Sequence, residues 1–139
     1  MTMKILAFPK DKNPYQELLY APLRKLGVEI KYIFPSSPSQ IVSLLLLIIL
    51  LPYYKTKGYR IFHLHWTHGF NSPIKILRPF YSWYFLFILK FLKQLGYNIV
   101  WTVHNVMPHE KQFVDDLKAR KILAESVDAK IVHSNSVIE

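Results

Sequence analysis

Short apolar runs with β character alternate with helical patterns along the whole chain. Turn residues separate them, chiefly the glycines at 27, 58 and 96 and several prolines. Five of the runs predict strands, at residues 3–8, 28–34, 59–66, 97–103 and 128–134.

The first and last helical patterns are amphipathic. The first begins at Pro14 with Asn13 as its cap, and Gly27 is expected to end it. Pro22 is expected to kink or shorten that helix. The last pattern covers residues 110–124. Its inward-facing residues are expected to be Phe113, Leu117 and Leu123.

The two middle helical patterns are apolar almost all round. Residues 41–51 contain one polar residue and are closed by Pro52 and Gly58, while the helix from Pro79 is closed by Gly96. A bilayer span needs about 20 apolar residues, so neither should cross a membrane. One side of each must cover the sheet, and the surplus side is expected to meet a partner domain or an anionic membrane surface. The side chains typical of a membrane interface are Tyr81, Trp83, Tyr84, Lys90 and Lys93.

Strands that alternate with helices predict a parallel sheet covered on both faces. We therefore expect one α/β domain spanning residues 1–139, with a Rossmann-like, doubly wound sheet of five strands in the order 2-1-3-4-5. Ligands of such sheets bind beyond the carboxyl ends of the strands, near the switch point.

The chain carries a formal net charge of +9 and no cysteine. The missing thiols exclude disulfides and thiolate metal sites. A basic excess suits nucleic acid, anionic lipid or a phosphorylated ligand. The lysines and arginines are scattered and no nucleic-acid motif is present, so nucleic acid is not a predicted partner.

Histidines gather at the predicted carboxyl edge of the sheet. Buried polar groups need partners or a purpose, so this edge is the candidate site. The five histidines that lie at strand ends are His65, His68, His104, His109 and His133.

A metal site is one interpretation of the stretch 62–70, FHLHWTHGF. His63 and His65 are two apart and share one side of a strand, as a metal-binding pair would. No carboxylate lies between Glu29 and Glu110 to complete the ligand set, so no metal site is assigned. The simpler interpretation of His63 is a core histidine bonded to a neighbouring backbone group.

The stretch 101–110, WTVHNVMPHE, is more specific. His104 directly follows a buried strand and is expected to project into the crevice as a hydrogen-bond donor or general base. Asn105 and Pro108 suit a tight turn, and Glu110 suits a helix start. A purely structural strand-to-helix turn is the alternative.

These motifs resemble the amino-terminal domain of GT-B-fold glycosyltransferases, in particular the group-1/family-4-like bacterial enzymes of polysaccharide and exopolysaccharide assembly. The resemblance rests on HLHW, WTVHNVMPHE and AKIVHS at three strand ends, and on NPYQELLYAPLRKLGVEI after the first strand. It spans nearly all 139 residues.

The resemblance implies transfer of a sugar from a nucleotide-diphosphate sugar, the co-substrate, to a hydroxyl of a glycan or lipid-linked acceptor. No cofactor is implied. His104 matches the family's catalytic histidine. The loop after the first strand lacks the glycines common in relatives, so Lys10 and Lys12 are the candidates for contact with the donor phosphate. The implied acceptor-binding residues are Asn13, Tyr15, His65, Trp66, Asn105, His109, Glu110 and Ser134.

The family's second, nucleotide-sugar-binding domain has no counterpart within these residues, since two such domains need roughly 250–350 residues. Catalysis requires the donor to be held against the acceptor. We therefore expect no transfer by this chain alone, and a donor-binding domain or subunit as partner. A cytoplasmic place at the inner face of a membrane would suit a lipid-linked acceptor. The alternatives are a non-catalytic binding or membrane-tethering subunit, and a metal-dependent hydrolase.

Overall fold

Five strands form one parallel sheet at the centre of the molecule. The structure is a computed structural model that describes residues 2–33, 40–70, 74–104 and 111–133. Neighbouring strands lie in the order β2-β1-β3-β4-β5, and every pair is parallel. This confirms the predicted α/β class and strand order. The strands are β1 (Lys4–Phe8), β2 (Glu29–Tyr32), β3 (Ile61–Leu64), β4 (Asn98–Val103) and β5 (Ala129–Val132).

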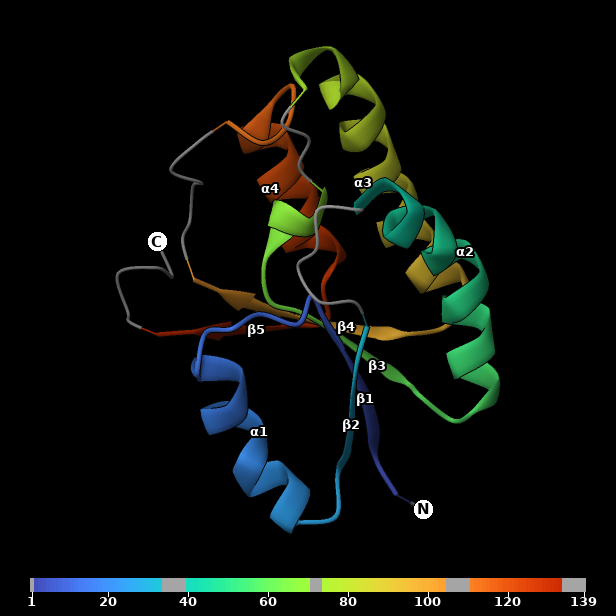
Figure 1. Cartoon of the computed structure of the whole chain (residues 1–139), viewed down its shortest axis with the longest axis vertical. Helices are drawn as coiled ribbons and strands as arrows, with labels where there is room; N and C mark the ends of the chain where they lie inside the picture. Colours follow the sequence, from blue (N-terminus) through green and yellow to red (C-terminus); the bar gives the residue numbers. More distant parts are fainter. Residues whose placement is uncertain (1, 34–39, 71–73, 105–110, 134–139) are drawn as a thin grey trace.

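Four helices cover the sheet unequally. α1 lies alone on one face, while α2, α3 and α4 share the other (Figure 1). The helices are α1 (Tyr15–Lys25), α2 (Gln40–Thr56), α3 (Arg78–Gln94) and α4 (Asp116–Ser126). Two short 3-10 turns, η1 (Thr67–Phe70) and η2 (Lys75–Leu77), lead from β3 into α3.

Two prolines predicted to interrupt helices do not end them. α1 continues past Pro22 to Lys25, and α2 continues past Pro52 to Thr56. A helical proline leaves the carbonyl four residues earlier without its N–H donor. Those earlier residues, Leu18 and Ile48, are exposed, so water can take the donor's place. Gly27 and Gly96 do end helices, with left-handed φ angles of +86° and +77°.

The two faces of the sheet differ in chemistry. On the face covered by three helices, which we call the apolar face, Phe62 and Leu64 of β3 join Ile99, Trp101 and Val103 of β4 in one hydrophobic core. Because side chains alternate along a strand, the intervening residues point to α1. On that side, the polar face, the buried side chains include His63, His65 and Thr102.

α4 begins later than the sequence predicted, and one of its expected inner residues is exposed. Asp115 caps the helix by accepting a hydrogen bond from the Lys118 amide at 2.9 Å. Phe113 and Leu123 are buried as expected, but Leu117 is 56% exposed, so its inward assignment is wrong. The later start leaves residues 111–115 outside the helix. Leu117 lies about 120° around the helix from Leu123, at about 100° per residue, and the buried residues of α4 are Ala119 and Leu123.

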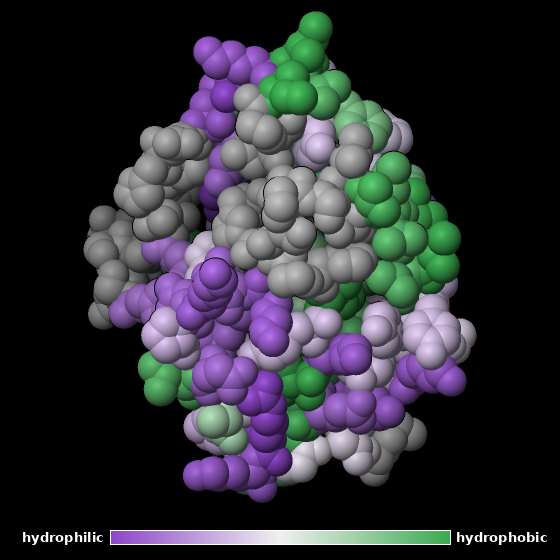
Figure 2. Space-filling model, viewed as in Figure 1, coloured by the Kyte–Doolittle hydropathy of each residue, from purple (hydrophilic) through white to green (hydrophobic). Residues whose placement is uncertain are grey.

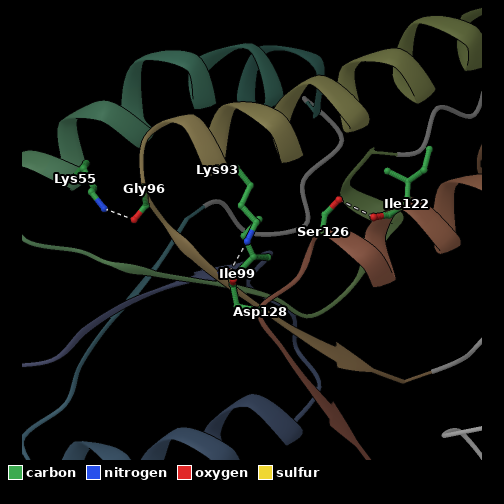
Figure 3. Close-up of polar contacts among 7 residues, drawn as sticks. All are labelled: Lys55, Lys93, Gly96, Ile99, Ile122, Ser126 and Asp128. Atoms are coloured by element: carbon green, nitrogen blue, oxygen red, sulfur yellow. Dashed lines mark hydrogen bonds and ion pairs between the residues drawn. The ribbon is translucent and has the colours of Figure 1, made fainter.

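Polar contacts fix the ends of α2 and α3 (Figure 3). The Lys55 ammonium donates to the Gly96 carbonyl oxygen at 2.6 Å, which ties the end of α2 to the turn after α3. Lys93 pairs with Asp128 at 2.7 Å, and the same carboxylate oxygen accepts a hydrogen bond from the Ile99 amide. Of the helices that the structure describes, none combines the length and apolar character needed to cross a bilayer.

Candidate functional site

A buried chain of hydrogen bonds joins α1 to the polar face of the sheet. The Tyr20 hydroxyl lies 2.7 Å from Nδ1 of His63 and 2.6 Å from Nε2 of His65. Nε2 of His63 lies 2.7 Å from the Thr102 hydroxyl oxygen on β4. All four side chains are almost fully buried. We call this series, Thr102–His63–Tyr20–His65, the histidine relay.

The relay has two proton arrangements. A tyrosine hydroxyl has one hydrogen, so Tyr20 donates to one histidine and accepts from the other. If it donates to His65, that ring carries its proton on Nδ1. If it donates to His63, Nδ1 of His65 is a bare acceptor. Nδ1 of His65 is buried and makes no hydrogen bond in the structure.

His63 was expected to be structural and bonded to the backbone. It is a buried core histidine, but its partners are the Tyr20 and Thr102 side chains rather than backbone groups. Burial, followed by the nearby His104, lowers the pKa of His63 to about 4. Burial and the two neighbouring histidines lower the pKa of His65 to about 2. Both rings are therefore neutral at pH 7.

His104 lies at the end of β4 inside a cluster of aromatic rings. Its ring stacks on Trp66, with centroids 4.4 Å apart and planes inclined by 6°. Tyr15 meets it edge-on at 4.9 Å, and Tyr15 also meets His133 edge-on at 4.9 Å. His65 is further away, at 6.3 Å between centroids. The structure thus brings together four of the predicted site residues.

His104 is neutral and one of its nitrogens makes no hydrogen bond. Burial, and then the charge of His133, lowers its pKa to about 4, while the carboxylate of Asp11 acts in the opposite direction. Nε2 of His104 is buried without a hydrogen-bond partner. A neutral imidazole next to a carboxylate can orient a hydroxyl group and accept its proton.

The loop before α1 holds Tyr15 in place. Asn13 accepts a hydrogen bond from the Tyr15 amide at 3.0 Å, and Asp11 accepts one from the Asn13 amide at 2.9 Å. Asn13 therefore supports the helix start, although α1 begins at Tyr15, one residue later than predicted. The exposed Asn13 side chain acts here by positioning Tyr15.

Gln16 and Tyr20 are site residues that the sequence analysis missed. The Gln16 amide nitrogen donates to the Pro9 carbonyl at 2.7 Å, and its oxygen accepts from the Asp11 amide at 3.0 Å. They are the two buried residues of α1. Their spacing of four places them on one helix face. His63 and His65 share one side of the strand, and buried side chains of this kind require polar partners from the helix above them.

Lys10 and Lys12 are exposed. The Lys10 ammonium lies 5.5 Å from the centroid of the Tyr32 ring, on the β2 side of α1. This placement of Lys10 does not support the expected contact with the donor phosphate, which stays a prediction. Asn105, His109, Glu110 and Ser134 lie outside the described residues, as does Pro108, and their roles stay predictions.

No group of three or more histidine, aspartate or glutamate side chains in the described parts of the chain is arranged to hold a metal ion. His63 and His65 do stack, with centroids 4.1 Å apart, but three of their four ring nitrogens bond to Tyr20 and Thr102. The chemistry of the pair is therefore that of a hydrogen-bond relay.

The fold and the site together define a single α/β domain with a Rossmann-like sheet and a cluster of buried histidines at its carboxyl edge. Comparison of the chain with family models, with curated proteins and with solved structures finds no match.

Proposed function

We propose that this domain is the acceptor-binding half of a glycosyltransferase that uses a nucleotide-diphosphate sugar. A donor-binding domain or subunit completes the enzyme, and the acceptor is a glycan or a lipid-linked sugar. The motifs HLHW, WTVHNVMPHE and AKIVHS support this proposal through their resemblance to the GT-B glycosyltransferases.

One observation carries the proposal: His104 is a neutral histidine whose buried Nε2 makes no hydrogen bond, at the edge where ligands of this fold bind. The flat rings of Trp66 and Tyr15 on either side of it suit a sugar ring, whose C–H faces are apolar. His65 of the histidine relay lies 6.3 Å from His104, between ring centroids.

His104 accepts the proton of the acceptor hydroxyl as that oxygen attacks the anomeric carbon of the donor sugar. The bond from this carbon to the diphosphate breaks, and the nucleotide diphosphate leaves with the bonding electrons. Asp11 favours the protonated imidazole. The negative diphosphate of a docked donor would raise the pKa of His104 further, toward the range in which a base is effective.

The test uses the chain reconstituted with its donor-binding partner. His104→Ala is expected to lower the rate of sugar transfer about 100- to 10,000-fold, as loss of a general base does. His104→Gln keeps a hydrogen-bonding group without a base and should be almost as slow. Lys25→Ala, on the exposed end of α1, is the control and should be fully active.

Two results would contradict the proposal. Unchanged transfer by His104→Ala would remove the catalytic assignment and favour a non-catalytic binding subunit. Efficient transfer by the purified chain without a partner would show that no donor-binding half is needed.

A further inference from the structure

The outer side of α2 is apolar and exposed. Only Leu44, Leu47 and Leu51 of its described side chains are fully buried, so α2 contacts the core through one narrow stripe. A helix at a protein surface normally carries charged residues on its outer side. Here six large apolar residues are 40% to 67% exposed, and we call them the α2 surface: Val42, Leu45, Leu46, Ile48, Ile49 and Tyr53.

Exposed aromatic residues also occur on α3, the helix beside α2. The two helices are held side by side, because the Tyr84 hydroxyl donates to the Leu44 carbonyl and the Tyr97 hydroxyl donates to the Leu51 carbonyl. Trp83 of α3 is 59% exposed and stacks on Phe87. Figure 2 shows hydrophobic atoms gathered over α2 and at the amino-terminal end of α3.

The sequence analysis assigned the wrong tyrosines to this exposed side. Tyr81 and Tyr84 are buried in the core, and Lys93 is held by Asp128 rather than free. The sequence pattern could not show which aromatic residues of α3 are buried, because consecutive positions from Tyr81 to Phe87 are nearly all apolar or aromatic. Tyr53, near the end of α2, is the exposed tyrosine of this region.

The charged residues of α2, α3 and the strands between them are of one sign. Residues 30–109 include eight lysines and arginines and not a single aspartate or glutamate. All nine acidic residues of the chain lie before or after this segment. α2, α3 and the strands between them therefore form a region in which every charged side chain is positive, next to a broad apolar surface.

Positive groups also surround a cavity at one end of the α2 surface. This cavity of about 340 Å³ lies at the amino ends of β1 and β2. Tyr53 belongs both to its lining and to the α2 surface. Its charged lining is three lysines, Lys4, Lys31 and Lys57, and one carboxylate, Glu29, which pairs with Lys4 at 3.4 Å.

We propose that the α2 surface, with Trp83, docks on an anionic membrane. The apolar side chains enter the boundary between headgroups and acyl chains, and the lysines around Tyr53 contact lipid phosphates. The positive charge of residues 30–109, with three lysines against one carboxylate in the adjoining cavity, selects this occupant. A second copy docked through the same surface would bring two positive regions together, which costs energy, whereas an anionic lipid surface attracts both.

The apolar part of the proposal is tested with Leu45→Ser/Ile49→Ser, which alters two exposed positions. We expect the full chain to co-sediment with phosphatidylcholine vesicles containing about 30 mol% phosphatidylglycerol, and this variant to bind about tenfold or more weakly. The matched control is Leu18→Ser/Leu26→Ser. These leucines, in α1 and directly after it, are 73% and 79% exposed across the sheet, and their loss should leave binding unchanged.

The charged part is tested with Lys31→Glu/Lys57→Glu. This variant should lose most binding to the anionic vesicles, while Lys25→Glu/Lys121→Glu, with the same change in net charge on exposed residues of α1 and α4, should lose much less. Binding of the unaltered chain should fall as salt rises, and pure phosphatidylcholine should bind far less, because the attraction is electrostatic.

Three outcomes would overturn the inference. The first is no binding to anionic vesicles at low salt. The second is equal loss in the α2 and α1 serine variants. The third is a dimer in sedimentation that dissociates in Leu45→Ser/Ile49→Ser, which would assign the α2 surface to a second copy of the chain.

Discussion

Trp66 and His104 stack face to face, with ring centroids 4.4 Å apart and planes inclined by only 6°. Trp66 follows β3 and His104 follows β4, and these strands are neighbours in the sheet. The contact therefore depends on parallel strands that end at the same edge. It removes water from one side of the imidazole, which is part of why burial lowers the pKa of His104.

Replacing Trp66 with alanine should raise the pKa of His104. With water on that side of the ring, the pKa should move from about 4 toward the ordinary histidine value of about 6.5. The measurement is a pH titration of the histidine ring signals by NMR. Trp83→Ala, at an exposed position on α3, is the control and should leave the titration unchanged. If His104 titrates alike in both variants, Trp66 is not what excludes water from it.

Tyr20→Phe should destabilise the domain by about 2–4 kcal/mol, because it removes the hydroxyl that two buried histidines share and leaves a nitrogen of each unpaired. The free energy of unfolding in urea gives the value. The matched control is Tyr32→Phe, whose hydroxyl donates to the exposed Glu17 at 3.1 Å. That variant should lose less than about 1 kcal/mol. Equal losses would mean that the relay does not stabilise the buried histidines.

The fold should lose stability as the pH falls below about 6.5. The folded-state pKa values of His63 and His65, about 4 and about 2, lie below the value of 6.5 expected for an exposed histidine. Between those limits the unfolded chain binds protons that the folded chain does not, so acid favours unfolding. Each histidine contributes a slope of up to about 1.4 kcal/mol per pH unit, or about 3 for both together, and His104, with a folded-state pKa of about 4, adds a third such contribution.

Urea denaturation at a series of pH values measures this slope. The carboxyl groups of Glu29 and Asp128 also have lowered pKa values, but their ordinary values are 4.5 and 3.8, so their effect begins at lower pH. The decline from pH 6.5 to about 5 therefore belongs mainly to histidines. A stability that stays constant over that range would show that the buried rings are not held neutral.

The sheet and its carboxyl-edge histidines were predictable because they depend on local patterns and on the geometry of parallel strands. Apolar runs located all five strands, and their alternation with helices indicated a parallel sheet, whose expected order 2-1-3-4-5 is the one that the structure has. The meeting of His65, Trp66 and His104 followed from their place at strand ends. Their neighbour Tyr15 could be named from the sequence only through the family resemblance.

Failures occurred where the outcome depended on which side of a helix packs inward. Leu117 was assigned to the inner side of α4, but the side that packs inward carries Ala119 and Leu123, and Leu117 lies about 120° around the helix from Leu123. In α1 the exposed Leu18 and the buried Tyr20 reverse what hydrophobicity alone suggests. Tyr20 is inside because the sheet beneath it carries histidines, and that requirement comes from a segment about 40 residues away.

The opposed chemistry of the two sheet faces also restricts how the chain can assemble. If a leucine-rich helix such as α2 lay over the histidine relay, the buried nitrogen and oxygen atoms of the relay would be unpaired. Each unpaired atom would lower the free energy of unfolding by about 1–3 kcal/mol. α1 laid on the apolar face would bury Gln16 and Tyr20 among hydrocarbon side chains. Each helix is thus matched to its own side of the sheet. The relay works against mistaken topologies during folding, in addition to any part it has in binding a ligand.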